Sequence, residues 1–405
     1  MDGFSAVCYD KKRLKKRGKG MKLFHLSDLH IGKQLNGYSL LENQRAVLNQ
    51  VAAYAREERP DAVLICGDIY DKSAPSAEAG TILDDFLFAL AALEIPVFMI
   101  SGNHDSGERL RYAARFLENH RIYLGTELPG KEGGHLKCVT LKDELGPVHF
   151  YLLPFLKPAY VRALFPEEKN LDYQGAVERL LARETINWKE RNVILSHQFY
   201  VSGKERPDTC DSETAVLTLG GLDAVDVKVL DGFDYGALGH IHGGQQVGRP
   251  GIRYCGTPFK YSVSEEHHKK SVTVAELGAK GEEVQLRFLP LFGVQDVKRL
   301  RGSLEFLKEA GGTACHDLVS LTVTDEEEPF DLREQLEQIY DHILELKVDN
   351  TRTRARLEEA GEEEIPHLGP GEIFGQFYEA VCGRGLNEKE AQVVEEILQE
   401  LEVEV

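Results

Sequence analysis

Short apolar runs, each the length of one buried strand, recur along the chain at residues 22–26, 62–66, 97–100, 193–195 and 235–238. Between the first three runs, apolar residues follow helical spacing over residues 41–58 and 77–93. A chain that alternates strands and helices in this way forms right-handed crossovers. The pattern therefore predicts an α/β fold with a mainly parallel sheet covered by helices.

Further segments extend this arrangement. Residues 108–119 are predicted to form a helix, residues 125–146 hairpins and turns, and residues 148–153 a strand. Strands at residues 253–257 and 271–277 are expected to add a second layer. The sole tryptophan, Trp188, lies in a polar helical insert and is expected to anchor the core.

The composition shifts near residue 291. A strand at residues 317–323, a helix at 331–344 and a short strand at Lys347 and Val348 predict a small β-α-β cap domain. The expected division is a first domain at 21–290, a cap domain at 291–357, an acidic linker at 358–370 and a helical region at 371–405.

The helical region at residues 371–405 contains two amphipathic patterns. Phe374, Phe377, Tyr378 and Val381 recur at helical spacing after Pro370. Asn387 followed by Glu390 is a helix-start signature, and an apolar stripe continues to Leu401. These helices could fold back on the cap domain, but their length and the preceding linker favour docking on a groove or coiled coil of a partner.

Size and charge limit the possible functions. A chain of 405 residues exceeds the usual size of a single core, so several domains are expected. The net charge of −19 is concentrated at the end, where residues 357–405 hold 14 Glu against Arg384 and Lys389. Because the rest of the chain is still mildly acidic, nucleic acid would have to be held by bound metal, local Lys and Arg, and a partner.

Other bulk features concern location in the cell. No apolar run approaches the length of a membrane span, so no membrane association is expected. Seven cysteines are scattered without a C-x-x-C pair, which favours the reducing cytoplasm over a disulfide framework. Residues 1–20 form a basic leader, interpreted either as an arm for nucleic acid or as the product of a start codon placed too far upstream.

Polar side chains follow each of the five apolar runs. They are Asp28 and His30, Asp68, Asn103 to Asp105, His197, and His240 with His242. A single Asp or His at a strand end is usually a helix cap or a turn former. Five such ends in one chain instead favour a site for two divalent ions, which needs a bridging carboxylate and neutral N and O ligands.

These blocks, in this order, resemble the motifs D-x-H, G-D, G-N-H-D, H and G-H-x-H of the calcineurin-like metallophosphoesterases. Within that superfamily the chain is similar to the SbcD-type nucleases, from Met21 almost to the C-terminus. The closer likeness rests on residues 26–32, 102–106, 153–158, 237–242 and 253–258.

The resemblance implies a metallophosphoesterase fold, a two-sheet β-sandwich flanked by helices. It assigns Asp28, His30 and His242 to one metal ion, Asn103, His197 and His240 to the other, and Asp68 to both. Ligands without thiolate suit Mn²⁺, with Mg²⁺ or Fe also possible. His104 is then the proton donor to the leaving oxygen, and Asp105 is expected to steer its imidazole.

The resemblance also implies a function. A metal-dependent exonuclease and endonuclease for DNA ends and hairpins is expected, working as a dimer with an SbcC-type ATPase that residues 371–405 would bind. The alternative within enzymes is another metallophosphoesterase, such as a cyclic-nucleotide phosphodiesterase or a phosphatase. A scaffold without chemistry is disfavoured, because it would have no physical need for a complete ligand set. Archaeal relatives carry a histidine where Asp71 stands, so Asp71 is expected either to cap its turn or to orient His104.

Overall fold

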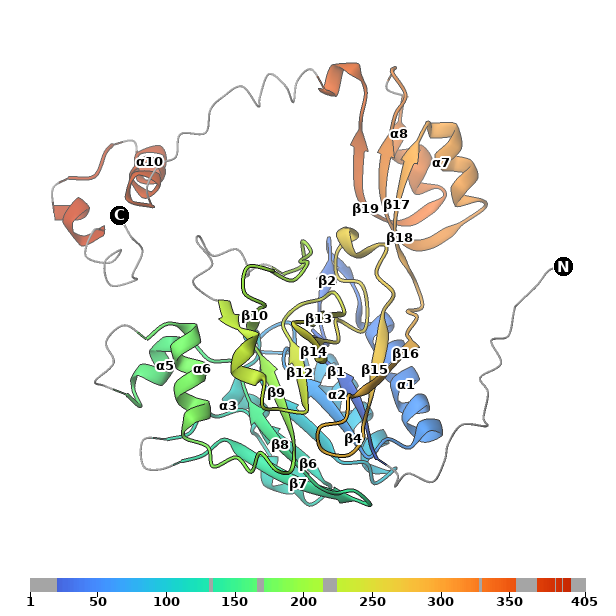
Figure 1. The fold of residues 1–405 in the computed structure, drawn as a ribbon. Coiled ribbons are helices and arrows are strands. Elements are labelled where there is room, and N and C mark those ends of the chain that lie inside the picture. The colour runs from blue at the N-terminus through green and yellow to red at the C-terminus, as the bar shows by residue number, and fades with distance from the viewer. Residues whose placement is uncertain are drawn as a thin grey trace. The chain divides into compact units, whose positions relative to one another are not determined.

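The computed structural model describes residues 20–130, 134–165, 171–213, 224–327, 330–354, 370–382, 384–387 and 389–394 (Figure 1). The contacts within the chain define two units. One comprises Met1–Val323 with Phe330–Lys347, and the other comprises Thr324–Pro329 with Val348–Val405. The expected leader at 1–20 and the end of the second tail helix lie outside the described residues, apart from Gly20.

A six-stranded sheet forms the first layer, in the order β16-β15-β1-β4-β5-β6. Four neighbouring strands are parallel, as the alternation of strands and helices predicts: β1 (Met21–Leu26), β4 (Ala62–Cys66), β5 (Val97–Ile100) and β6 (Ile122–Gly125). Two antiparallel strands, β15 (Ser271–Leu277) and β16 (Gln285–Pro290), continue the sheet beyond β1. The prediction that residues 271–277 belong to the second layer is therefore wrong, because β15 pairs with β1.

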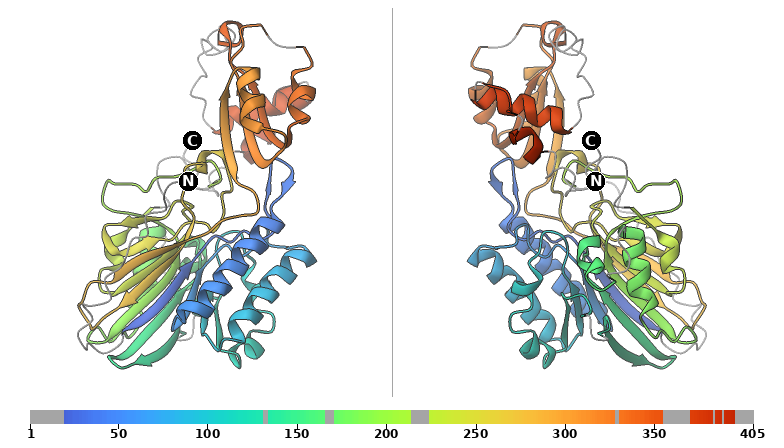
Figure 2. Two further views of the ribbon diagram at one scale, coloured as in Figure 1. Left: turned by 90° about the vertical axis from the view of Figure 1, so that its right-hand side faces the viewer. Right: turned by 90° about the vertical axis from the view of Figure 1, so that its left-hand side faces the viewer.

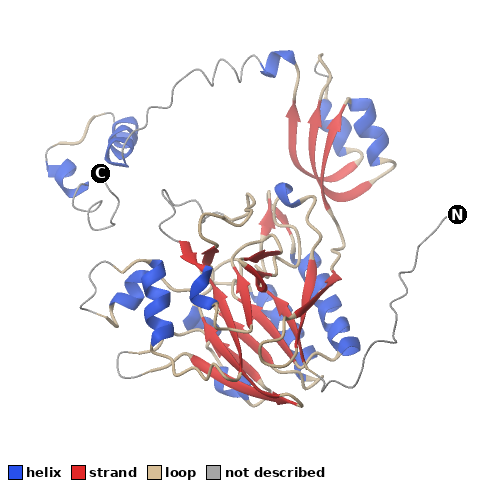
Figure 3. Cartoon of the chain, in the orientation of Figure 1, coloured by secondary structure: helices blue, strands red, loops and turns tan. Residues whose placement is uncertain are grey.

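A second six-stranded sheet has the order β13-β14-β12-β9-β8-β7. Figure 3 draws the strands of the protein as red arrows. Its four central strands are parallel and its two edge strands are antiparallel. In sheet order they are β13 (Gln245–Val247), β14 (Arg249–Tyr254), β12 (Tyr235–Gly239), β9 (Arg191–His197), β8 (Gly146–Leu153) and β7 (Lys137–Asp143).

The two sheets pack face to face around one apolar core. Phe98 of the first sheet stacks on Phe150 of the second, with ring centroids 4.4 Å apart. Leu64, Val193 and Ala237 belong to the same fully buried cluster. The parallel strands read as continuous apolar runs because both of their faces are covered. The expected two-sheet sandwich is confirmed.

Helices cover the outer faces of both sheets (Figure 2). Helix α1 (Leu41–Glu58) packs Val47 and Val51 into a cluster with the first sheet, and α2 (Ala77–Ala91) joins it. On the second sheet, α6 (Tyr173–Ala182) buries Val177 and Leu180. The remaining short elements are α5 (Pro158–Arg162), β2 (Gln34–Leu35), β3 (Tyr38–Ser39), β10 (Phe199–Val201), β11 (Ala224–Asp226) and the 3-10 helices Val227–Leu230 and Val263–Glu265.

Two local predictions are wrong. The helix expected at residues 108–119 is broken into α3 (Gly107–Leu110) and α4 (Ala114–Glu118), because Ala113 adopts a left-handed φ of 61°. Trp188 is 48% exposed and packs edge-on against Phe233. It therefore lies at the surface and does not anchor the core.

A three-stranded sheet follows, in the order β17-β18-β19, with two helices. The helix predicted at residues 331–344 ends early, and residues from Tyr340 onward form a strand. Pairing with a neighbouring strand outweighs the local helix preference there. The elements are β17 (Val297–Gly302), α7 (Leu304–Gly311), β18 (Cys315–Val323), α8 (Leu332–Glu337) and β19 (Tyr340–Val348).

In the second unit, α10 (Pro370–Cys382) begins at a proline, a favoured first helical residue. Asn387 and Glu390 cap the following helix reciprocally: each side chain accepts a hydrogen bond from the backbone N–H of the other. Tyr378 joins the two segments, because its hydroxyl donates to Glu390 at 3.0 Å. Across the described ranges, no helix is long and apolar enough to cross a membrane.

Candidate metal centre

The carboxyl ends of five parallel strands meet at one place. Asp28 and Asp68 follow β1 and β4, and the backbone N–H of Asp28 donates to Gly67 at 3.0 Å. His197, at the end of β9, lies opposite Gly239 in the pairing with β12. His197 also bonds the carbonyl of Cys66 at 2.7 Å, which joins the two sheets at this edge. The sandwich thus brings the predicted residues of both sheets together.

Glycines before the polar residues allow this close approach. A Cβ on Gly67 would lie 2.2 Å from Nδ1 of His197, and one on Gly102 would lie 2.1 Å from Oδ1 of Asp68. At Gly239 it would lie 1.9 Å from the carbonyl oxygen of Cys66. The glycine in each of the G-D, G-N-H-D and G-H-x-H blocks therefore has a steric cause.

The backbone is strained at the same place. Asp28, His30 and Asp68 have φ values of 52°, 42° and 48°, and His240 has a φ of 106°. Such conformations are costly for residues other than glycine and tend to persist at functional sites. Four of the seven predicted ligands are held this way.

One group of side chains consists of Asp28, His30 and His242, whose ligand atoms lie within 4.8 Å of one another. His30 is 1% exposed, yet within the described residues neither of its ring nitrogens has a hydrogen-bond partner. The nearest carboxylate oxygens, of Asp68 and Asp71, are 3.6 Å away. Because buried polar atoms are nearly always partnered, this imidazole fits the position of a metal ligand.

A second group lies beside the first. The amide oxygen of Asn103 is 3.2 Å from Nε2 of His197 and 3.1 Å from Nδ1 of His240. Asp68 lies between the groups, with Oδ2 3.4 Å from His197 and 3.6 Å from His30. All seven predicted ligands thus converge, and Asp68 stands where a bridging carboxylate would stand.

Two of the histidines are oriented by hydrogen bonds to residues outside the predicted ligand set. Nδ1 of His197 donates to the Cys66 carbonyl, so Nε2 is the ring nitrogen that faces Asp68. Nδ1 of His242 is 2.6 Å from the hydroxyl of Ser212, which also donates to Glu265 at 2.7 Å. Partners of this kind fix the tautomer and orientation of metal-binding histidines.

Ser212, Glu265 and Lys270 were missed by the sequence analysis. Glu265 is fully buried and pairs with the ammonium group of Lys270 at 2.5 Å. Lys270 also donates to the carbonyl oxygen of His242 at 3.1 Å. The three residues follow no apolar run and show no periodicity, so no physical rule singles them out in the sequence.

Burial and neighbouring charges set the protonation of the side chains at the centre. Burial lowers the pKa of His240 to about 3 and that of His30 well below its ordinary value, so both imidazoles are neutral and can donate lone pairs. Burial opposes the charged form of His197, but Asp68 and Asp28 outweigh it and raise its pKa to about 9. Burial also opposes the charged form of Asp68, but His197 outweighs it and holds the pKa of this carboxyl well below its usual range.

His104 stands at the rim of the centre. Its Nδ1 donates to the carbonyl oxygen of Asp71 at 2.9 Å, which leaves Nε2 to accept or give a proton. Asp71 therefore orients His104 through its main chain, while its carboxylate pairs with Lys33 at 3.1 Å. The ligand atoms of His104, His30 and Asp68 also lie within 4.8 Å of one another, so His104 reaches into the same space as the predicted ligands.

Asp105 contacts the loops and not the imidazole. Its carboxylate accepts backbone hydrogen bonds from Ile69, Tyr70 and Gly102 at 2.9–3.1 Å. Burial and the nearby Asp68 raise its pKa to about 6. Asp105 thus ties the loop after β5 to the loop after β4, and any effect on His104 is indirect.

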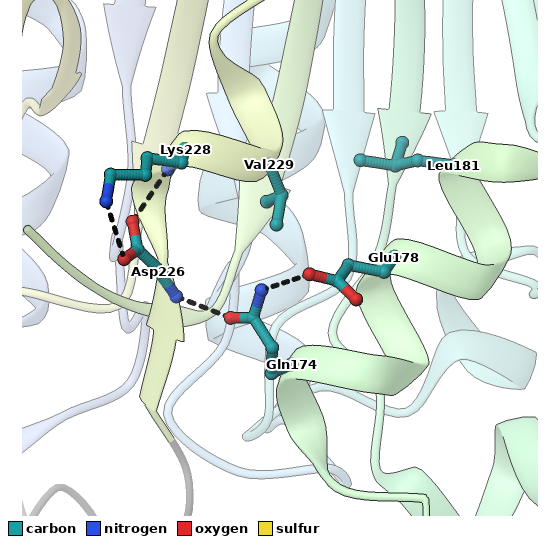
Figure 4. A pocket seen from close by; sticks show the side chains of 6 residues that line it. All are labelled: Gln174, Glu178, Leu181, Asp226, Lys228 and Val229. Carbon is teal, nitrogen blue, oxygen red and sulfur yellow. Dashed lines mark hydrogen bonds and ion pairs between the residues drawn. The ribbon is translucent and has the colours of Figure 1, made fainter. Parts of the chain in front are cut away.

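A separate hollow of about 380 Å³ contains none of the predicted ligands (Figure 4). Its polar groups bond one another: Gln174 accepts from the backbone of Asp226 and donates to Glu178. Since these groups are already partnered, the metal centre is the better candidate site.

Comparison with known proteins agrees with this geometry. The family model described as calcineurin-like phosphoesterase matches residues 21–244, and one described as Type 5 capsule protein repressor C-terminal domain matches residues 294–381. This defines a phosphoesterase hydrolase with a buried Asp and His cluster.

Two relatives identify the branch of that family. The D subunit of the nuclease SbcCD from Staphylococcus epidermidis is 30% identical over 93% of this chain and 98% of its own length, and that from Staphylococcus saprophyticus subsp. saprophyticus is 29% identical over 93% and 98%. The chain therefore belongs to the calcineurin-like phosphoesterases and, within them, to the SbcD nuclease subunits. The crystal structure of TT1561 of Thermus thermophilus matches with a TM-score of 0.39 and 12% identity, covering 66% of this chain and 99% of that one, and adds nothing to the assignment.

Proposed function

We propose that this chain cleaves phosphodiester bonds of DNA with two divalent ions held at the strand ends. The observation that carries this is the convergence of seven ligand side chains around a buried His30 without a hydrogen-bond partner in the described chain. Asp28, His30 and His242 would hold one ion, and Asn103, His197 and His240 the other, with Asp68 between them. Oxygen and imidazole ligands suit Mn²⁺, and Mg²⁺ or Fe are the alternatives.

Two bound divalent ions would supply an activated water and charge stabilisation at the phosphate. The chain's own residues do the remaining work. His104 is held by the Asp71 carbonyl, so its Nε2 is available to give a proton to the leaving oxygen. Asp105 accepts three backbone hydrogen bonds and so fixes the loop that carries Asn103 and His104 beside the loop that carries Asp68.

The substrates are proposed to be DNA ends and hairpins, cut in exonuclease and endonuclease modes during repair and recombination. Support comes from the relatives, which are nuclease subunits matched over 98% of their length. The expected cap domain at 291–357 would lie along the DNA. A cyclic-nucleotide phosphodiesterase or phosphatase remains the alternative, although such enzymes usually stop soon after the G-H-x-H block.

Residues 371–405 are proposed to bind an SbcC-type ATPase. The relatives are named as subunits of SbcCD, which supports a partner of this kind. In the described part of this region, Phe377 and Val381 of α10 are 62% and 67% exposed, and Val393 is 52% exposed. An exposed apolar helix face of this kind fits a groove or coiled coil.

A homodimer of the nuclease subunit within a heterotetramer is also proposed, acting in the cytoplasm. The support is three large aromatic side chains that are mostly exposed: Phe88 on α2 at 73%, Phe116 on α4 at 75%, and Tyr112 between α3 and α4 at 85%. Large apolar side chains exposed to this degree would be covered in an interface between two copies of the chain.

The test is cleavage of labelled blunt and hairpin duplexes with Mn²⁺, with and without an SbcC-type partner and ATP. We expect cleavage products that require Mn²⁺ and disappear when a chelator is added. The partner and ATP should increase the rate of cleavage at duplex ends. Hydrolysis of cyclic nucleotides or phosphomonoesters in place of DNA would contradict the proposal.

A further inference from the structure

The segment Leu153 to Pro158 has no part in the ligand set, although it is one of the motifs on which the resemblance rests. It leaves the end of β8 beside the metal centre, and the backbone N–H of Phe155 donates to the carbonyl of Ser101 at 2.9 Å. Leu156 is fully buried in the core of the second sheet. These two anchors fix the segment against the loop that carries Asn103.

A pocket of about 440 Å³ opens between this segment and the loops after β5 and β6. Asn103 and Phe155 line its inner end, and Lys157, Tyr160, Thr126 and Glu127 line the rest. This volume lies within the usual range for small-ligand sites, about 300–1,000 Å³. The pocket shares Asn103 with the proposed metal ligands, so an occupant would adjoin a phosphate held there.

Phe155 connects the pocket to the centre. Its ring stacks on His240 with centroids 6.5 Å apart and an interplanar angle of 27°, and it meets His197 edge-on at 6.4 Å. Phe155 therefore contacts two proposed ligands, His197 and His240, and also forms the apolar end of the pocket. Tyr160, on α5, is 58% exposed and offers a second aromatic face at the pocket.

The pocket is lined by one lysine, Lys157, and two acidic residues, Asp105 and Glu127, and the lysine is the group that can meet an anion. Among the described residues, the ammonium group of Lys157 makes no hydrogen bond or ion pair, so it can meet a phosphate. The two acidic residues are already engaged: Asp105 accepts three backbone hydrogen bonds, and Glu127 pairs with Arg111 at 2.5 Å. An aromatic face, an unpartnered cation and a neighbouring phosphate site together match one nucleotide.

We propose that this pocket binds the nucleotide next to the scissile phosphate, with its base stacked on Tyr160 and its other phosphate near Lys157. This subsite rests on the proposed function, because it needs a nucleic acid strand at the metal centre. Stacking tolerates any base, so the pocket would position the strand for cleavage without reading its sequence.

The stacking is tested with a single-stranded oligonucleotide in Mn²⁺ and the same strand carrying one abasic residue beside the cut. Tyr160→Ala should lower kcat/KM on the intact strand by about 5- to 150-fold, the range for one base–aromatic stack. The abasic residue should lower kcat/KM of wild type by a similar factor. It should not lower kcat/KM of Tyr160→Ala any further, because removing either partner of one contact already removes the whole contact.

Two variants serve as controls. Tyr160→Phe retains the ring and should keep wild-type kcat/KM. Phe292→Ala removes an aromatic side chain that is 66% exposed outside the pocket and should also leave the rate unchanged. Thermal unfolding of all variants should match wild type, since none of these side chains is buried.

The cation is tested separately by salt dependence. Lys157→Gln should weaken strand binding and reduce the slope of log affinity against log salt by about 0.7, the value for one phosphate contact on a single strand. Lys157→Arg should restore the slope.

The outcomes separate the two proposals. If wild type fails to cut DNA in Mn²⁺, the proposed function itself is wrong. If wild type cuts DNA but Tyr160→Ala and the abasic strand show no loss, or their losses simply add, the nucleotide subsite is wrong and the proposed function stands.

Discussion

The loops at the strand ends and the helices at the end of the chain differ in what surrounds their defining side chains. Asp28 and His197 are fully buried and face other ligands of the same chain. Phe377 and Val381 of α10 are mostly exposed. The first region assembles its chemistry within the chain, whereas the second presents an apolar face that something else must cover.

This difference predicts that the two regions can be damaged independently. Changes at the strand ends should affect metal binding or turnover and leave partner binding intact. Changes on α10 should do the reverse. The predictions below use this separation, starting from the largest expected effect.

His104→Ala should lower the rate of phosphodiester cleavage by about 10²–10⁴-fold, the usual cost of losing a general acid. Both metal ions should remain bound, because the other seven side chains are intact. Turnover and metal content are to be measured on the same sample. Loss of an ion, or near-normal turnover, would show that His104 is a ligand or a bystander.

Ser212→Ala should weaken Mn²⁺ binding by about 10- to 100-fold, because it removes the hydrogen bond that orients His242. Isothermal titration measures this directly. Ser264→Ala is the matched control, since Ser264 bonds the same loop at Asp211 but touches no ligand. Equal effects of the two variants would mean that the loop matters and the contact with His242 does not.

Phe377→Asp should weaken binding to an SbcC-type ATPase by about 30-fold or more, as expected for a central apolar contact. Mn²⁺-dependent cleavage by the isolated subunit should be unchanged. Gln376→Asp adds the same charge at the neighbouring exposed residue and should have a much smaller effect. If both variants bind normally, α10 is not the docking helix.

A smaller effect is expected at the surface of the nuclease domain. Arg287 and then Lys22 lower the pKa of Glu58 to about 2, which ties α1 to β16 and β1. Because the folded-state pKa is lowered, this stabilisation is present above the unfolded pKa near 4.5 and is lost as pH falls from there toward 2.

Glu58→Gln should therefore lower the free energy of unfolding by about 1 kcal/mol at neutral pH, a value reduced by solvent screening. The difference from wild type should shrink below pH 4.5. Urea unfolding at several pH values measures this difference in the free energy of unfolding. Glu57→Gln, a substitution at the neighbouring residue, is the control. A difference that stays constant with pH would contradict the ion-pair explanation.

The strand ends could be predicted because each ligand directly follows an apolar run. Parallel strands of one sheet bring their carboxyl ends to one edge, which places Asp68 beside Asn103. His197 ends a strand of the second sheet, and its place in the same site followed from the resemblance of the motifs. The glycines before them follow from close packing that only the structure reveals.

Other features depend on contacts between distant segments. The pairing of β15 with β1, the strand β19 and the exposure of Trp188 were all mispredicted, because tertiary contacts outweigh local preference. Ser212 and Glu265 could not be predicted either, since their role depends on meeting His242 across 30 and 23 residues of chain.

The central claim is that seven side chains bind two ions with Asp68 between them. Mn²⁺ titration followed by electron paramagnetic resonance tests it most directly. Wild type should bind two ions per chain and give the spectrum of a coupled pair, since ions that share a carboxylate lie roughly 3.5–4 Å apart. Asp68→Asn should lose the coupled signal and both high-affinity sites. A single ion in wild type, or an unaltered pair in Asp68→Asn, would contradict the account.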